Sequence, residues 1–388
     1  MTVKNLLDKP KKLLLFIFLL YAIVPYETVS NPLLSYVFHL IFIVFVGIFA
    51  LYTGNFKIKM NQFAKFTMFF LICFIAINSV VSYGLNEFLL FLSIVFGSIV
   101  ASTIYNNRNF YNLFVSAFKW LIVFSISMLF LQLIVLDTTG KVLHIHEMFF
   151  PFSEARIGVF GLLNRLGGVY LEPGTYSNWM HLFLVIYMVL SENINRPIFY
   201  IGAISMILTL SAYGVIIGIY LLMVLLLSKI KHSSLKKKFS TLLLLMIVSF
   251  FSIGYIGDST AVKLVSAKMD SSSDGSANLR KQAYERYIEN IEDYFIVGEG
   301  FSNKFGEGIA SIQDAGLLLN MSVALGILFS IIFIMIYTYA FLKKNNMEIL
   351  FASLPIFISK IYYYEFSFWL LFFLLILKNK QFLTYKKY

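Results

Sequence analysis

The stretch "LFVSAFKWLIVFSISMLFLQLIVL", residues 113–136, decides the fold class of this chain. It holds a single charged residue, Lys119, and it is longer than the roughly 20 apolar residues that cross the hydrocarbon core of a bilayer. The whole chain of 388 residues shares this character, with 59% hydrophobic residues, 13% charged residues and a mean hydropathy of +0.81. Soluble domains carry about 25% charged residues. The composition therefore predicts an all-α, polytopic integral membrane protein.

Segments of the same kind recur along the chain and predict about twelve transmembrane helices in a single domain, residues 1–388. Two of these helices depend on dividing the chain near "LTLSAYGVI", residues 208–216. The predicted spans are 13–27, 33–53, 64–82, 86–105, 113–136, 176–191, 197–211, 213–228, 239–257, 315–342, 347–363 and 366–378.

The basic residues indicate which side of the membrane each connection occupies. Most of the 31 Lys and Arg residues lie in one set of connections and in the two terminal segments, and basic residues favour the cytoplasmic side. With an even number of spans, both termini are then cytoplasmic. The net charge of +11 could also indicate nucleic-acid binding. Because the basic residues cluster at the ends of apolar runs, we expect no nucleic-acid partner.

Two long connections, residues 137–175 and 258–314, fall on the outer side and hold most of the 20 acidic residues. Connections of this length usually carry function. The second contains "SANLRKQAYERYIENIEDYF", residues 276–295, which predicts a helix along the membrane surface or over the bundle. Its apolar stripe comprises Tyr284, Tyr287, Ile288, Ile291, Tyr294 and Phe295.

Four of the six arginines, Arg156, Arg165, Arg280 and Arg286, lie in these outer connections. Arginine presents a planar fork that binds phosphate or carboxylate through two parallel hydrogen bonds. Arg156 and Arg165 also lie among glycines, which permit close approach of a ligand to the backbone. These arginines are candidates for anion binding. The alternative is that they pair with the acidic residues of the same connections.

Glu172 lies directly before a predicted span, followed by Pro173 and Gly174. A helix that begins at Thr175 or Tyr176 would direct its N-terminal amides at the same place. Arginines, a helix N-terminus and one carboxylate together suit a lipid-linked pyrophosphate. Glu172 is the first candidate for a general base, and its alternative role is to complement the helix dipole. Asp314, at the start of the tenth span, is the second candidate base.

Several other ionisable residues are weaker candidates for a functional role. Lys119, His181, Lys360 and Glu365 lie in or near spans, where ionisable residues are functional candidates. For Lys360 and Glu365 we expect anchoring near the outer face, and a functional role is the alternative. His144 and His146 form the only close pair of histidines, and we expect a solvated loop there, not a metal site.

Several motifs of the outer connections resemble those of the bacterial O-antigen polymerases (Wzy type), in the O-antigen ligase/polymerase superfamily. One of them, "LTLSAYG" at residues 208–214, is similar to the family's Leu-Thr-x-Ser-Arg-x-Gly stretch. It lacks the usual arginine of the family and has Ala212 and Tyr213 there. The motifs are the Arg-x10-Gly spacing from Arg156 to Gly167, "EPGTYSNW" (172–179), "LTLSAYG", the arginine, helix and Gly-x-Gly of "NLRKQAYERYIENIEDYFIVGEGF" (278–301), and "DAGLLLNMSVALGILFS" (314–330).

This resemblance implies a metal-independent glycosyltransferase with a glycosyltransferase-C-like fold and no cofactor. It would transfer a growing glycan from undecaprenyl pyrophosphate to a new lipid-linked repeat unit, at the periplasmic face of the inner membrane. Membrane lipid and a chain-length regulator protein are further candidate partners. The predicted catalytic residues are Arg156, Glu172 and Arg280, and the predicted substrate-binding residues are Arg165, Arg286, Asp314 and Tyr176.

Two alternative functions stay open. An O-antigen ligase would share the fold and the donor, but ligases of this superfamily carry a histidine in the second large outer connection, and residues 258–314 contain none. A lipid-linked oligosaccharide flippase or another transporter would place polar residues and broken helices near the middle of the membrane. The charge of this chain lies instead in its outer connections.

Overall fold

The computed structural model describes residues 32–54, 58, 60–81, 85–149, 159–160, 163–191, 196–230, 275–299, 316–342 and 347–377. These residues are almost entirely helical. The strands β1 (Val159–Phe160) and β2 (Leu163–Asn164) pair antiparallel in a short hairpin. The helices are α2 (Pro32–Thr53), α3 (Gln62–Val81), α4 (Leu85–Asn106), α5 (Arg108–Thr139), α6 (Ile145–Phe149), α7 (Pro173–Ser191), α8 (Pro197–Leu208), α9 (Ala212–Ile230), α12 (Gly275–Glu289), α13 (Leu317–Leu325), α14 (Ile327–Leu342), α15 (Met347–Ser353), the 3-10 helix η3 (Leu354–Ile358) and α16 (Phe366–Leu377).

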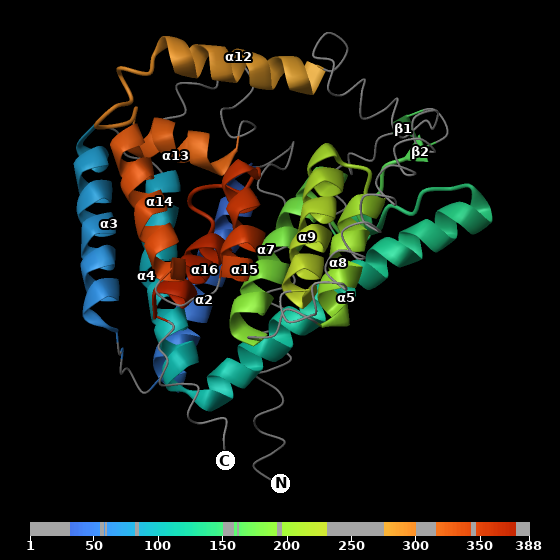
Figure 1. The fold of residues 1–388 in the computed structure, drawn as a ribbon, viewed down its shortest axis with the longest axis horizontal. Coiled ribbons are helices and arrows are strands. Elements are labelled where there is room, and N and C mark those ends of the chain that lie inside the picture. The colour runs from blue at the N-terminus through green and yellow to red at the C-terminus, as the bar shows by residue number, and fades with distance from the viewer. Residues whose placement is uncertain are drawn as a thin grey trace.

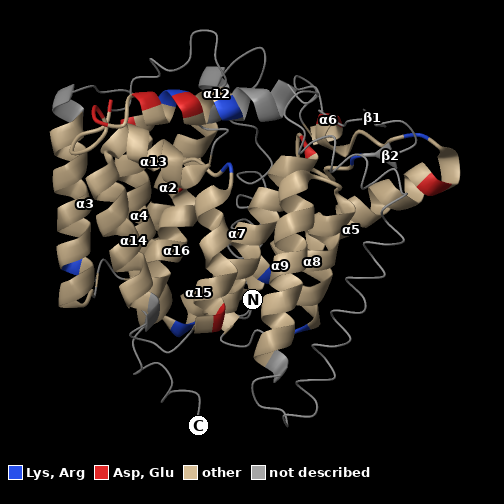
Figure 2. Cartoon of the chain, turned by 45° about the horizontal axis from the view of Figure 1, so that its top comes forward, with Lys and Arg blue, Asp and Glu red and all other residues tan. Residues whose placement is uncertain are grey.

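The helices form two groups that lie side by side (Figure 1). One group contains α2, α3, α4, α14 and α16, and the other contains α5, α7, α8 and α9. Helix α15 contacts α7 and α9 in one group and α14 in the other. Helix α12 lies across one end of the bundle, and the β1–β2 hairpin lies at the same end (Figures 1 and 2). The two long connections therefore contribute elements to one end of the molecule.

Helices α4 and α5 are long and apolar enough to cross a membrane. Helix α5 has well-defined ends. Asn107 accepts hydrogen bonds from the backbone N–H groups of Asn109 and Phe110, and Gly140 ends the helix with a φ of 66°. The outward face of α5 exposes large apolar side chains, among them Trp120 and Ile134, at 56% and 59%. Further apolar helices surround these two, over shorter described stretches.

Helix α7 lies in the interior, where it contacts α5, α8, α9, α15 and α16. Every side chain from Tyr176 to Ser191 is buried. A helix without a polar, solvent-facing side is typical of a core position. Because this helix begins at the candidate site, the position of its N-terminus is fixed by packing on all sides.

Helices occupy the first seven predicted spans that fall within the described residues, those between residues 33 and 228. The division near residue 210 is confirmed, since α8 ends at Leu208 and α9 begins at Ala212. Leu210 adopts a φ of 54°, and the hydroxyl of Ser211 accepts a hydrogen bond of 2.9 Å from the backbone N–H of Gly214. The predicted spans 13–27 and 239–257 lie outside the described residues.

The prediction of one continuous helix over 315–342 is wrong, because the chain breaks at Gly326, whose φ is 100°. The segment that follows α12 fills this break. The backbone N–H groups of Ile327 and Leu328 donate to the carbonyls of Tyr294 and Phe295, at 2.8 and 3.0 Å. The N–H of Glu299 donates to the carbonyl of Val323 at 2.8 Å. The end of α13 and the start of α14 would otherwise leave these N–H and C=O groups unpaired. Residues 294–299 supply their hydrogen-bond partners.

The predicted span 347–363 is also broken in the structure, whereas α16 matches the prediction of 366–378 over its described residues. Pro355 has no N–H to donate to Phe351, so α15 passes into η3. Helix α16 has 12 residues, which extend about 18 Å against a hydrocarbon core of about 30 Å. Residues 359–365 between them are mostly buried, and the carbonyl of Tyr364 accepts a hydrogen bond from Ser93 of α4.

Side chains of α7 and α9 satisfy the carbonyls near Pro355. Tyr220 donates to the carbonyl of Phe351 at 2.8 Å, and the Nε2 of His181 donates to that of Ala352 at 2.7 Å. The hydroxyl of Tyr213 lies 3.2 Å from the carbonyl of Pro355 and 2.8 Å from the Nδ1 of His181. His181 and Tyr213 therefore hold the α15–η3 break against the core.

Replacement of Gly326 by alanine tests the first of these breaks. A Cβ at this position would lie 2.5 Å from the carbonyl oxygen of Ile296, in a backbone conformation that L side chains rarely adopt. We expect Gly326→Ala to lower the free energy of unfolding by about 1–3 kcal/mol, measured by thermal unfolding of the purified protein in detergent. The control is Gly174→Ala, whose Cβ would meet its nearest neighbour at 3.4 Å. Equal unfolding temperatures for the two variants would contradict this packing.

Candidate functional site

The segment from Arg165 to Glu172 folds into the end of the bundle. Residues 166–170 are buried. The backbone N–H of Tyr170 donates to the carbonyl of Gly167 at 3.0 Å, and Gly168 adopts a φ of 60°. A Cβ on Gly167 would lie 2.9 Å from the carbonyl oxygen of Tyr170. These two glycines form a tight turn, which accounts for them without the close ligand approach that the sequence suggested.

Gln132 of α5 holds this segment in place, and its side chain is fully buried. Its Nε2 donates to the carbonyl of Leu143 at 2.7 Å. Its Oε1 accepts from the backbone N–H of Gly168 at 2.9 Å. One amide side chain therefore joins the two ends of the first long connection to α5.

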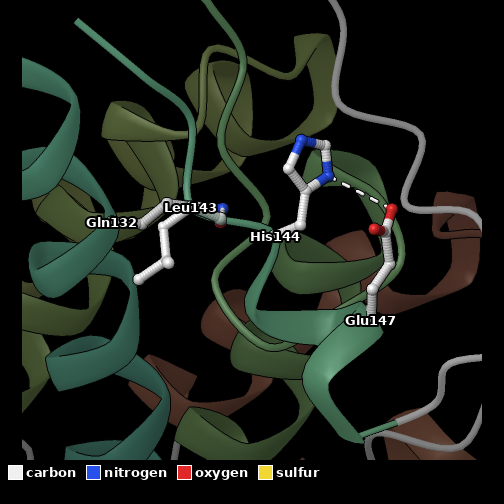
Figure 3. A network of polar contacts seen from close by, with 4 residues as sticks. All are labelled: Gln132, Leu143, His144 and Glu147. Carbon is white, nitrogen blue, oxygen red and sulfur yellow. Dashed lines mark hydrogen bonds and ion pairs between the residues drawn. The ribbon is translucent and has the colours of Figure 1, made fainter. Parts of the chain in front are cut away.

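The two neighbouring histidines have different surroundings. His146 is buried, and its Nδ1 donates to the carbonyl of Val169 at 2.8 Å. Burial lowers the pKa of His146, which keeps its ring neutral. His144 is exposed and faces Glu147, with its Nδ1 3.1 Å from Oε1 (Figure 3). Within the described residues, no three His, Cys, Asp or Glu side chains are grouped as metal ligands.

Glu172 lies at the N-terminus of α7, which begins at Pro173 and not at Thr175 or Tyr176. Its carbonyl accepts from the backbone N–H of Tyr176 at 3.1 Å, so Glu172 occupies the N-cap position. Its Oε1 lies 3.4 Å from the hydroxyl of Thr175. Glu172 therefore marks the start of α7, and its two roles, general base or partner of the helix dipole, stay predictions.

Tyr176 is fully buried, which differs from the role expected of a substrate-binding residue. Its hydroxyl donates to the Oγ of Ser205 at 2.8 Å, and its ring packs edge-on against Tyr170, with centroids 5.5 Å apart. No surface of Tyr176 is exposed to a substrate in this structure. Its role here is to fix the first turn of α7 against α8.

Helix α12 carries arginine at the same end of the bundle (Figure 2). Arg286 is half-buried on this helix, and Arg165 is half-buried at the start of the inward segment. The backbone of Arg280 lies in α12, but its side chain lies outside the described part of the structure. Arg156 and Asp314 also lie outside the described residues. Arg165 and Arg286 thus belong to separate elements at one end of the molecule.

The apolar stripe predicted over residues 276–295 divides into two sets, and α12 ends at Glu289, before its last three members. Tyr287 and Tyr294 stack on each other, with centroids 5.7 Å apart, and pack against Val323 of α13. The remaining members face away from the bundle. These exposed residues are Tyr284, Ile288, Ile291 and Phe295.

The ionisable residues in or near the predicted spans differ in their exposure to solvent. Lys119 is exposed on α5, whereas His181 is fully buried. Glu365 is 1% exposed and lies directly before α16, where its carboxyl group hydrogen-bonds the backbone of Ser367. The expected anchoring near the outer face therefore does not fit Glu365, which caps a buried helix.

Sequence analysis missed Glu299, the central residue of "GEG" at 298–300. Its Oε1 accepts a hydrogen bond of 3.2 Å from the hydroxyl of Tyr294. Its Oε2 is buried and has no hydrogen-bond partner within the part of the chain that the structure describes. The sequence feature that could have identified Glu299 as a candidate is its position between two glycines.

Comparison of the chain with protein-family models, with curated proteins and with solved structures found no match.

Gln132→Met tests how the inward segment is held. Methionine has a similar volume but leaves the N–H of Gly168 and the carbonyl of Leu143 without this partner. We expect the free energy of unfolding to fall by about 1–3 kcal/mol, measured by thermal unfolding in detergent. Gln282→Met, on an exposed position of α12, is the control and should be nearly neutral. A stable Gln132→Met protein would show that other contacts hold residues 165–172.

Proposed function

We propose that this chain is a multi-pass membrane glycosyltransferase that polymerises lipid-linked oligosaccharide repeat units. It would have about twelve spans and a glycosyltransferase-C-like arrangement in the bacterial inner membrane, with both termini in the cytoplasm and the active site on the periplasmic face. The product would be O-antigen or another surface polysaccharide. The proposal rests on sequence motifs and on the arrangement of the outer elements.

One observation carries most of the argument. Helix α12 and the segment 165–172 belong to connections far apart in the sequence and lie at the same end of an apolar bundle (Figures 1 and 2). Both bring arginine to that end, although lysine is the more common cation of this chain. Large apolar side chains cover the outward faces of α3, α5 and α9, and such surfaces are typical of contact with lipid. This arrangement supports an anion site at the level of lipid headgroups.

The chemistry requires charge stabilisation in particular. A sugar hydroxyl of the acceptor attacks the anomeric carbon, and the pyrophosphate leaves with the electron pair of the broken bond. Guanidinium groups that bind the pyrophosphate oxygens stabilise the charge that develops there. Arg156, Arg165, Arg280 and Arg286 are the residues proposed for this role. Undecaprenyl carries the donor, and the apolar surface of the bundle suits its chain.

A flippase for the same lipid-linked units is the second candidate, and the helix breaks at Gly326 and Pro355 favour it. Discontinuous helices often surround the substrate site of transporters. Here, however, protein groups already satisfy the backbone at both breaks. A ligase that transfers the glycan to a lipid A core is the third candidate.

Reconstitution separates these functions. The purified chain in vesicles, supplied only with undecaprenyl-pyrophosphate-linked repeat units, should produce a ladder of longer glycans. A flippase would move units across the bilayer without a ladder. A ligase would require a lipid A core. Absence of a ladder, while the protein is folded, would contradict the proposal.

Arg156→Lys and Arg165→Lys test the role of arginine in this reaction. Lysine keeps the charge but loses the planar fork, so we expect the rate of chain extension to fall by about 100-fold or more. The control is Arg108→Lys at the start of α5, an exposed position at the other end of the bundle. Full activity of both outer variants would contradict phosphate binding through paired hydrogen bonds.

A further inference from the structure

The side chain of Glu299 is held from one oxygen only. Tyr294 donates its hydroxyl to Oε1 at 3.2 Å. The other oxygen, Oε2, is buried and has no hydrogen-bond partner within the described residues. A buried acceptor without a partner destabilises the folded chain, and such atoms in folded proteins often mark a place where a ligand or a catalytic step completes the contact.

The backbone around this carboxylate is fixed at both ends. The N–H of Glu299 donates to Val323 of α13, and the carbonyl of Tyr294 accepts from Ile327 of α14, each at 2.8 Å. Gly298 lies directly against the carbonyl of Val323, where any Cβ would collide with it. Glu299 is therefore attached to the break between two helices. A rigid support of this kind is what a catalytic group requires.

The surroundings of the pair act on the hydroxyl of Tyr294. Burial first, and then the charge of Glu299, raise the pKa of the Tyr294 hydroxyl, so this hydroxyl stays protonated and continues to donate. The charge of Arg286 lowers the pKa of the same hydroxyl, and the charge of Asp293 raises it, as that of Glu299 does. The side chains that pack here from α13 and α14 are apolar, namely Leu319, Val323 and Ile327.

We propose that Glu299 is the general base of the glycosyl transfer, with Tyr294 as its positioning residue. This inference rests on the proposed function. Oε2 accepts the proton of the acceptor hydroxyl while the new bond forms between that oxygen and the anomeric carbon. The bond from the anomeric carbon to the pyrophosphate breaks, and the pyrophosphate departs with the electron pair. Glu299 then releases the proton to water.

Glu299 and Glu172, the first candidate base named from the sequence, differ in their contacts. Glu172 directs its carboxylate to the first turn of α7, where Thr175 contacts it. Glu299 instead keeps one oxygen without a hydrogen-bond partner among the described residues, and it belongs to the same connection as Arg286. Base and pyrophosphate-binding cation are then supplied by one structural unit, α12 and the strap of residues 294–299 that follows it.

The test uses the full-length chain in vesicles with undecaprenyl-pyrophosphate-linked repeat units. Glu299→Gln keeps the size of the side chain and its bond to Tyr294 but accepts protons poorly. We expect the turnover rate to fall by about 100-fold or more, with KM within about threefold of the parent. The acidic limb of the pH–rate profile should disappear. Tyr294→Phe should lower turnover by about tenfold and shift that limb, because the base remains but is poorly oriented.

Two further variants separate chemistry from folding. Glu292→Gln removes an exposed acid from the same segment and should leave turnover unchanged. Glu299→Asp keeps a carboxylate and should retain more activity than Glu299→Gln at equal thermal stability. Turnover of Glu299→Gln equal to that of the parent, or equal losses in the Asp and Gln variants, would overturn the assignment. If the parent chain forms no ladder, the proposed function fails as well. If Glu299→Gln forms the ladder at the rate of the parent, the assignment of Glu299 as the base is contradicted but the proposed function is not.

Discussion

The structure depends on the need to satisfy backbone N–H and C=O groups wherever a helix is interrupted inside apolar surroundings. An unpaired backbone group in such a place costs several kcal/mol in hydrocarbon. Each interruption is met by a particular partner. Residues 294–299 complete the break at Gly326, and His181, Tyr213 and Tyr220 meet the carbonyls near Pro355. Gln132 does the same for the turn at Gly168.

This constraint connects the fold to the proposed chemistry. The segment after α12 belongs to the second long connection, yet its hydrogen bonds make it part of the α13–α14 break. Tyr294 and Glu299 are consequently fixed relative to the bundle instead of lying on a free loop. The first long connection is joined to α5 through Gln132 in the same manner. Both connections are thus attached to the apolar bundle, at the end where Arg165 and Arg286 lie.

The sequence predicts much of this fold because apolar length and turn chemistry are local properties. Helices α4 and α5 follow from long apolar runs, and the turn between α8 and α9 follows from Thr209 and Ser211. The breaks at Gly326 and Pro355 lie inside apolar runs, and their partners come from distant segments, so periodicity does not reveal them. For the site, the sequence predicts that Arg165 and Arg286 lie in the two long connections, which contribute elements to one end of the molecule. The burial of Tyr176, the capping by Glu172 and the contact between Tyr294 and Glu299 depend on tertiary packing.

The central claim is that the chain joins lipid-linked repeat units to one another. The most direct test is a gel profile of the surface polysaccharide from the host after deletion of this gene. The account predicts that the ladder of chain lengths collapses to a single repeat unit on its anchor, and that the intact gene restores it. An unchanged ladder would contradict the account. Loss of every repeat, with lipid-linked units accumulating, would contradict it in favour of a ligase or a flippase.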